Sequence, residues 1–238
     1  MIKGCAFGVG NTLISDTKLV QDSLKDMANW LQRRGIIKQK GLLIATYNKI
    51  NKSALQPFVR HTFSEEQFFR KTFEELGIKN ISSKQVLQKY RQFLINKTKP
   101  NNDVIEVFKF LRNRAIKITL LTNERVDRIE AFIQKTALIN LLDAVVISEQ
   151  ARVKKPNPAI FVEASKRLEV KCEEMAMFGD NEITDGGAKC LRIKFVLVTA
   201  YKNPKWQWKK DLAIQPDYVI RKIKKKEMEK CLEFLAKF

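Results

Sequence analysis

Four short polar stretches, each placed at or a few residues beyond the end of an apolar run, carry side chains with which this chain could bind a phosphoryl group. They are Gly8-Val9-Gly10-Asn11-Thr12, Thr122-Asn123, Lys154-Lys155-Pro156-Asn157-Pro158, and Gly179-Asp180-Asn181 followed by Asp185-Gly186-Gly187. Hydroxyl, ammonium and backbone N–H groups bind phosphate oxygens, and carboxylates bind the divalent cation that often accompanies a phosphate. The residue types therefore indicate a phosphate site, with Thr122, Asn123 and Lys155 as its anion-binding residues.

The elements that must position these stretches alternate between strand and helix. Strands are predicted at 2–7, 116–121, 142–148, 175–178, 194–199 and 218–220. Helices are expected at 102–114, 125–135 and 158–168, the last with Asn157 as its cap and Pro158 in its first turn. This alternation favours a parallel sheet covered on both faces, in which ligands bind beyond the carboxyl ends of the strands. The four stretches should then meet at one edge of the sheet.

The region between the first two strands is predicted to be entirely helical. Helices are expected at 16–34, 41–51, 64–76 and 83–97, with Ser64 and Ser82 as candidate caps. The predicted domains are therefore an α/β core formed by residues 1–14 and 99–238, and a helical cap formed by residues 15–98.

Three of the polar stretches resemble, in order and position, motifs of the haloacid dehalogenase (HAD) superfamily of hydrolases. Leu120-Leu121-Thr122-Asn123 resembles the second motif, Lys155-Pro156-Asn157-Pro158 the third, and Phe178-Gly179-Asp180-Asn181 with Asp185 and Gly187 the fourth. The resemblance extends over essentially the whole chain and is to members with a helical cap after the first strand. It implies a Rossmann-like α/β core and phosphatase chemistry.

The first motif departs from that family. The family pattern is Asp-x-Asp-Gly-Thr-Leu, whereas this chain has Gly8-Val9-Gly10-Asn11-Thr12-Leu13. In the family the first aspartate attacks phosphorus and the second is the general acid and base, so Gly8 and Gly10 stand at the nucleophile and acid/base positions. Loss of such a nucleophile lowers turnover about a millionfold. We expect a disabled phosphatase, a pseudoenzyme that keeps a phosphate-sized pocket for binding or regulation.

No rescuing nucleophile is predicted near the two glycines. Thr12 has no histidine near it to activate its hydroxyl, and Asp16 is expected about two helical turns beyond the loop. An active phosphatase that uses a metal-bound water with Asp180 and Asp185 remains an alternative.

The resemblance also implies a Mg²⁺ ion held by Asp180, Asp185 and the backbone carbonyl of Gly10. Because one direct carboxylate ligand has become glycine, we expect magnesium to bind more weakly than in the family. The charges of Asp180, Asp185 and Lys155 sum to −1, so an anion could bind to Thr122 and Lys155 without a metal. A phosphate-bearing small molecule is the expected ligand.

The composition suggests a third reading, a basic scaffold that binds RNA or an acidic protein. The 238 residues include 45 lysines and arginines against 26 aspartates and glutamates, a net charge of +19. The segment 202–210 interleaves Trp206 and Trp208 with lysines, which is typical of a single-strand nucleic-acid platform or of a loop folded onto the core. The run 221–226 is expected to open the last helix, where cations hint at an external anion.

Simpler readings exist for most of these residues. Gly8 and Gly10 could serve a tight loop that needs positive φ, Thr122 could cap a helix, and Lys155 could be a solvated lysine. A dinucleotide fingerprint is disfavoured because Leu13 occupies the third glycine position. His61 is expected to have a packing or surface role.

The remaining sequence features concern the cell compartment. Cys5, Cys172, Cys190 and Cys231 form no CxxC pair, and a single histidine disfavours a zinc site of the usual ligands. We expect reduced core thiols in a cytoplasmic protein, since no apolar run is long enough to cross a bilayer.

Overall fold

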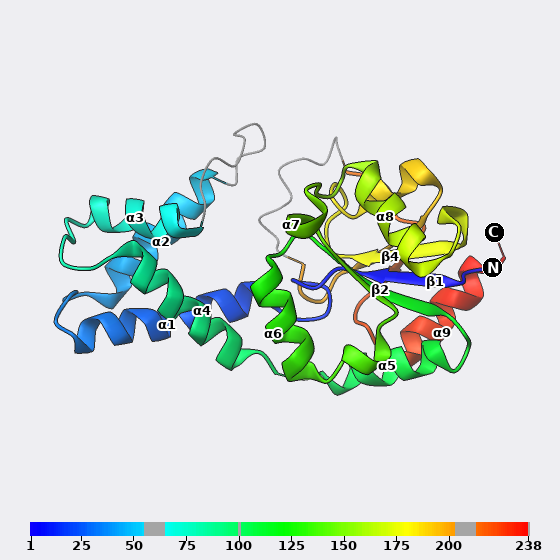
Figure 1. The fold of residues 1–238 in the computed structure, drawn as a ribbon, viewed down its shortest axis with the longest axis horizontal. Coiled ribbons are helices and arrows are strands. Elements are labelled where there is room, and N and C mark those ends of the chain that lie inside the picture. Colours follow the sequence, from blue (N-terminus) through cyan, green and yellow to red (C-terminus); the bar gives the residue numbers. More distant parts are fainter. Residues whose placement is uncertain (55–64, 100, 203–212, 238) are drawn as a thin grey trace. The chain divides into compact units, whose positions relative to one another are not determined.

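The computed structural model describes residues 1–54, 65–99, 101–202 and 213–237 (Figure 1). The chain divides into two compact units. The first, which we call the α/β unit, is Met1–Thr17 with Lys99–Phe238. The second, the helical unit, is Lys18–Thr98.

The α/β unit is built on one six-stranded sheet with the order β3-β2-β1-β4-β5-β6, in which every pairing is parallel. The strands are β1 (Gly4–Phe7), β2 (Lys117–Thr122), β3 (Ala144–Ile147), β4 (Met175–Gly179), β5 (Lys194–Val198) and β6 (Tyr218–Ile220). Each lies within or beside a predicted strand. The predicted fold class, a Rossmann-like parallel sheet with a helical insertion, is confirmed.

Side chains of the strands alternate between two cores, one on each face of the sheet. Cys5 and Phe7 enter one core and Ala6 the other, as the two-residue period of a strand requires. The first core is covered by α5 (Asn102–Arg112), α6 (Val126–Thr136) and α9 (Lys225–Leu235), and α9 lies beside α5 in Figure 1. The second is covered by α8 (Pro158–Leu168). The sheet is therefore buried on both faces.

Several short elements were not predicted. They are α7 (Ser148–Ala151) and the 3₁₀ helices η1 (Ile139–Leu141), η2 (Cys172–Glu174) and η3 (Gly186–Leu191). The predicted cap of α8 is confirmed, because the Asn157 side chain accepts a hydrogen bond from the Ala159 N–H at 2.9 Å. The last helix begins at Lys225 instead of Arg221.

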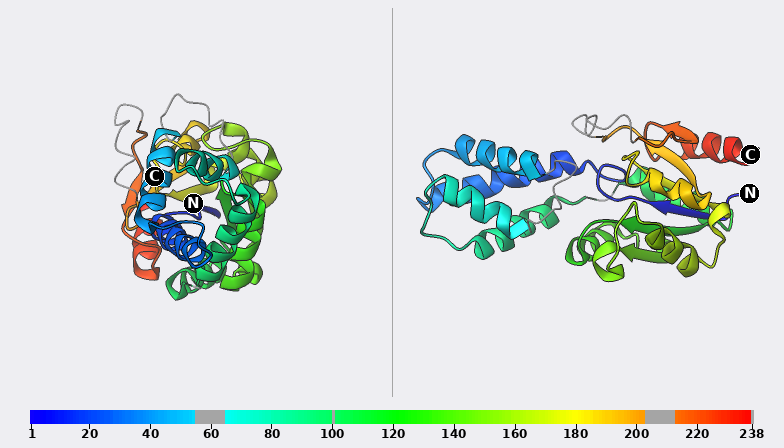
Figure 2. Two further views of the ribbon diagram at one scale, coloured as in Figure 1. Left: turned by 90° about the vertical axis from the view of Figure 1, so that its left-hand side faces the viewer. Right: turned by 90° about the horizontal axis from the view of Figure 1, so that it is seen from above.

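In its described residues, 18–54 and 65–98, the helical unit packs four helices around its own core. They are α1 (Asp16–Arg33), which starts in the α/β unit, α2 (Lys40–Ala54), α3 (Glu65–Glu75) and α4 (Ser83–Lys97), seen from two further sides in Figure 2. Leu24, Met27 and Leu31 are buried on one side of α1, at the three- and four-residue spacing of a helix face. The ring of Phe69 lies 5.0 Å from that of Tyr47 and 5.1 Å from that of Tyr90.

Two details of the sequence analysis concern helix starts and thiols. Ser82 occupies the N-cap position of α4 as predicted, although its side chain makes no capping hydrogen bond, and Ser64 lies outside the described residues. Cys5 and Cys231 are buried, and burial raises the pKa of the Cys231 thiol to about 12. Cys190 is exposed and Cys172 half-buried, so the expectation of core thiols holds for two of the four.

Within the described residues, no helix is both long and apolar enough to cross a membrane.

The aromatic rings that pack around Phe7 of β1 give a first testable prediction. The Phe7 ring lies 4.8 Å from that of Phe178 and 5.0 Å from that of Phe108, and Phe7 is fully buried. Phe7→Ala should lower the free energy of unfolding by about 3–5 kcal/mol, because it leaves a cavity in the core. Ile139→Ala, at a position 60% exposed, should change it by less than about 0.5 kcal/mol in the same urea titration. Equal effects of the two substitutions would contradict this packing.

Candidate functional site at the carboxyl edge of the sheet

The carboxyl ends of β2, β1 and β4 lie side by side, because β1 pairs with both of the other strands. The chain leaves β1 at Gly8 and β4 at Asp180, and β2 ends on Thr122 itself. Three of the four polar stretches therefore begin at one edge of the sheet. The third stretch, around Lys155, reaches the same edge through its side chain.

Lys155 forms a buried ion pair with Asp185. Its Nζ contacts Asp185 Oδ1 and also donates a hydrogen bond to the Leu121 carbonyl at 2.9 Å. The other oxygen of Asp185 accepts from the Asn181 N–H at 3.1 Å. Lys155 is only 5% exposed, so the simpler reading of a solvated lysine is wrong. The pair is internal, and its two charges cancel.

Asn123 holds the loop that carries Lys155. Its Nδ2 donates to the Lys155 carbonyl at 3.0 Å, and its Oδ1 accepts from the Lys155 N–H at 2.9 Å. Both ends of the amide are thereby used, which makes Asn123 a positioning residue in this structure.

Thr122 is buried at the end of β2, and its Oγ1 accepts a hydrogen bond from the Glu124 N–H at 3.2 Å. The reading of Thr122 as a helix cap is wrong, because the residue at the cap position of α6 is Arg125. The hydroxyl keeps its own hydrogen for a further acceptor.

Gly8 lies where the family nucleophile is expected, and the backbone does not require a glycine there. Its φ is not in the left-handed region, and the residue with positive φ in this loop is Asn11, at 56°. The reading of Gly8 and Gly10 as positive-φ residues is therefore wrong. A Cβ placed on Gly8 would lie 2.9 Å from Thr12 Oγ1. That hydroxyl donates to Asp180 Oδ1 at 3.4 Å, so it occupies the space beside the missing side chain.

Charged side chains surround the position of a Cβ on Gly10. Such an atom would lie 3.1 Å from Glu124 Oε1 and 3.4 Å from the Cβ of Asp16. Asp16 comes close because Gly10 and Ile14 form a β-bridge that folds the loop back. The expectation that Asp16 lies two turns away is therefore wrong.

Arg128 joins these two acids into one cluster. It contacts Asp16 through one guanidinium nitrogen and Glu124 through the other, the latter at 2.8 Å. The sequence analysis missed this cluster, although the four-residue spacing of Glu124 and Arg128 is the usual signal for a helical ion pair.

Asp180 is the site carboxylate with the most perturbed ionisation. Burial and the neighbouring Asp185 carboxylate raise its pKa from 3.8 to about 7, against the opposing effects of Lys155 and the hydrogen bond from Thr12. Near neutral pH this carboxyl exchanges between its protonated and ionised forms.

The residues predicted to bind Mg²⁺ fit the ion poorly. Both oxygens of Asp185 already have partners, and Asp180 favours its protonated form below neutral pH. Magnesium prefers several oxygen ligands in octahedral geometry. Among the described residues, no group of three His, Cys, Asp or Glu side chains could hold a metal. Gly10 has no carboxylate, and both oxygens of Asp185 are already bonded. Of the carboxylates predicted to bind the ion, only Asp180 therefore remains available.

Comparison with known proteins decides the family. A model of the haloacid dehalogenase-like hydrolases matches residues 2–188, and a related HAD-hydrolase-like model matches residues 153–226. The chain belongs to the haloacid dehalogenase-like hydrolase family. The resemblance carried by the second, third and fourth motifs is thus confirmed at the level of the family.

Individual members of the family match over most of the chain. A glyceraldehyde 3-phosphate phosphatase of Methanopyrus kandleri is 26% identical over 183 residues, 76% of each chain. The magnesium-bound structure of YfnB from Bacillus subtilis has a TM-score of 0.73 at 18% identity and covers 98% of this chain and 99% of its own. A HAD phosphatase from Thermococcus onnurineus has a TM-score of 0.65 at 20% identity, with 97% and 98% covered. The two structures show a shared fold.

Three features considered in the sequence analysis are not part of the site at this edge of the sheet. Residues 203–210 of the aromatic and lysine-rich segment, and His61, lie outside the described residues. The cationic run 221–226 precedes α9 and enters its first turn, and the Arg221 and Lys222 N–H groups donate to the Glu227 carboxylate. An internal carboxylate, that of Glu227, thus already lies at the backbone of this cationic run, and the external anion that its cations suggested stays a prediction.

The raised pKa of Asp180 predicts how stability depends on pH. Between about pH 4 and 7 the folded HAD-like chain holds a proton that the unfolded chain has lost, so the free energy of unfolding falls as pH rises through this window. Asp180→Asn removes the titrating group. Its melting temperature relative to wild type should therefore increase from pH 4 to pH 8. Asp22→Asn, on α1, should follow the wild-type profile, and a flat difference for Asp180→Asn would contradict the raised pKa.

The buried ion pair predicts an asymmetric response to substitution. Lys155→Met should cost about 3–5 kcal/mol of unfolding free energy, because it leaves the Asp185 carboxylate buried without its cation. The double variant Lys155→Met/Asp185→Asn should recover much of that loss in urea titrations. Equal instability of the single and double variants would show that the loss does not come from an unpaired Asp185 charge.

Proposed function

We propose that this protein is a HAD-like hydrolase homologue without covalent phosphatase chemistry, which keeps a phosphate-binding site for a binding or regulatory role. The observation that carries the proposal is Gly8, which follows β1 where the family nucleophile stands. A glycine offers no oxygen to attack phosphorus, and no step through an aspartyl phosphate can start there.

The neighbouring hydroxyl does not replace the missing nucleophile. Thr12 is only 2% exposed, and its hydroxyl hydrogen is directed to Asp180. A hydroxyl that is buried and already bonded has poor access to a substrate phosphorus. The acid/base role is also vacant, because Asp16 and Glu124 beside Gly10 are both held by Arg128.

The anion site is proposed to rest on Thr122 and on backbone N–H groups at the ends of β1 and β2. The charge of Lys155 is balanced by Asp185, so this lysine contributes less attraction than an unpaired one. The expected ligand is a small phosphate ester. The loss of two carboxylates from the family pattern lowers the repulsion that a phosphate dianion would meet.

One observation supports a second candidate, an active hydrolase of non-covalent mechanism. A carboxyl with a pKa near 7 is suited to general acid and base catalysis at neutral pH, and Asp180 has such a value. In this alternative Asp180 would take a proton from a water that attacks phosphorus. Asp185 cannot share that role while it pairs with Lys155.

Phosphate release from an aryl phosphate, with and without magnesium, separates the two candidates. Wild type should release phosphate at the background rate, and Asp180→Asn should be indistinguishable from it. Magnesium-dependent turnover in wild type that disappears in Asp180→Asn would establish the second candidate instead.

Rebuilding the first motif tests whether the glycines are the cause. Gly8→Asp/Gly10→Asp should recover little activity by itself, because the new side chain at position 10 lies against Glu124 and Asp16 and is repelled by their charge. Adding Glu124→Ala should raise turnover by about tenfold or more over the double variant, as expected when a like charge next to a catalytic carboxylate is removed. Glu124→Ala alone is the matched control and should stay inactive. No gain from the triple variant in folded protein would count against this explanation.

Phosphate binding can be measured without catalysis. Inorganic phosphate should raise the melting temperature of wild type, and Thr122→Val, which keeps the shape but removes the hydroxyl, should weaken this effect. A rise of equal size in both proteins would remove Thr122 from the proposed site.

A further inference from the structure

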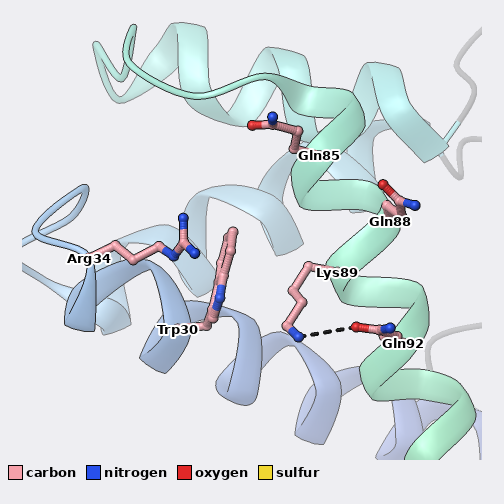
Figure 3. Close-up of a pocket in the computed structure, with 6 residues that line it drawn as sticks. All are labelled: Trp30, Arg34, Gln85, Gln88, Lys89 and Gln92. Carbon is pink, nitrogen blue, oxygen red and sulfur yellow. Dashed lines mark hydrogen bonds between the residues drawn. The ribbon is translucent and has the colours of Figure 1, made fainter.

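The helical unit contains a surface groove that the sequence analysis did not find. It lies between α1 and α4 and has a volume of about 380 Å³. Its lining consists of Trp30, Arg34, Gln85, Gln88, Lys89 and Gln92 (Figure 3). All six residues belong to the helical unit, so the groove is independent of the strand edge described above.

The four lining residues of α4 form one face of that helix. Positions 85, 88, 89 and 92 follow the helical spacing of three and four residues. The buried residues Val86, Leu87, Tyr90 and Leu94 occupy the other face and pack into the core. Three amides and one ammonium group are thus presented together, on an element fixed by its packing.

Trp30 supplies a flat aromatic surface on the facing helix. The Arg34 guanidinium lies 4.7 Å from the centre of the ring, a cation–π distance. Figure 3 shows the indole standing between Arg34 and Lys89. The groove therefore combines a ring with cations on either side of it.

Neither cation of the groove has an acidic partner within the described residues. Arg34 contacts the Trp30 ring, and Lys89 donates to Gln92 Oε1 at 3.1 Å and lies over the Phe93 ring. Some other cations of the helical unit do have acidic partners, as Lys49 has in Glu75 and Lys97 in Asp26. The lining itself contains no carboxylate. The groove thus offers uncompensated positive charge.

The net charge of the whole helical unit extends this attraction. Residues 18–98 contain 16 lysines and arginines against six aspartates and glutamates, a net charge of +10. More than half of the excess charge of the chain thus lies in about a third of its length. A long polyanion would gain more from this distribution than a single small anion would.

We propose that this groove binds single-stranded nucleic acid. A base would stack on the Trp30 ring, the neighbouring phosphates would contact Arg34 and Lys89, and the glutamine amides would hydrogen-bond to base edges. Stacking on aromatic rings and Arg planes, with amides reading base edges, is how proteins recognise single strands. An acidic peptide would use the cations but has no flat ring for the indole and little need for three amides.

Binding of fluorescently labelled 12-nucleotide single-stranded RNA to the full chain tests the proposal. Fluorescence anisotropy should show binding that weakens as salt rises from about 50 to 200 mM. Trp30→Leu should weaken binding on the order of tenfold, by loss of stacking. Arg34→Gln/Lys89→Gln should also weaken it and should reduce the salt dependence. The charge-matched control Lys40→Gln/Lys79→Gln changes exposed lysines outside the groove and should have a smaller effect.

Further outcomes separate this groove from other sources of binding. Trp30→Leu must keep the wild-type circular dichroism spectrum and melting temperature for its loss of binding to count. Loss of binding in Trp206→Leu/Trp208→Leu with full binding by Trp30→Leu would move the site to the lysine-rich segment and overturn the proposal. Equal competition by polyglutamate or by adenosine monophosphate would also overturn it, in favour of an acidic protein or a free nucleotide. None of these results bears on the separate proposal that Thr122 binds phosphate.

Discussion

The buried contact between Lys155 and Asp185 is the constraint around which the strand edge is arranged. Each charge is buried and would be costly without the other. The lysine also donates to the Leu121 carbonyl of β2, while the aspartate accepts from the Asn181 N–H, so one pair links β2, the loop that carries Lys155 and the loop after β4. Asn123 adds a second tie by bonding both backbone groups of Lys155. These bonds hold the site together without any help from the loop after β1.

The glycines of the site fall into two groups. One group is required by the packing of the scaffold, and the other stands at the positions of the family's catalytic residues. Gly179 and Gly187 are required by packing, since a Cβ on Gly179 would overlap Asp185 and one on Gly187 would lie 2.6 Å from Pro156. Gly8 and Gly10 meet only the outer atoms of Thr12 and Glu124 as their nearest neighbours, at 2.9 and 3.1 Å, and neither has a left-handed φ. The packing around Lys155 and Asp185 therefore demands glycine, whereas a side chain in the loop after β1 requires the Thr12 hydroxyl and the Glu124 carboxylate to move. A scaffold of this kind can persist when the first motif no longer carries its carboxylates.

The sequence predicted well the features that depend on residues a few positions apart. It predicted poorly the features that depend on contacts between residues far apart in the chain. The strands, the Asn157 cap and the buried face of α1 follow from periodicity and cap chemistry, which act over a few residues. The position of Asp16 depends on a bridge between Gly10 and Ile14, and its contact with Arg128 spans 112 residues, so no local signal reveals it. The burial of Lys155 was missed for the same reason, because its partner lies 30 residues further along the chain. The groove of the helical unit is formed by two helices more than 50 residues apart in sequence.

The charges at the strand edge explain how an anion could bind there with little dependence on a cation. Lys155 and Asp185 cancel, and Arg128 offsets one of the two acids beside Gly10. Asp180, with a pKa near 7, carries only part of a negative charge at neutral pH. The edge as a whole is therefore only weakly negative, whereas the family pattern adds two further carboxylates in the loop after β1. Under the proposed function, the absence of those carboxylates would lower both the need for a divalent cation and the means of holding one, since the same oxygens that repel phosphate are the ligands that magnesium requires.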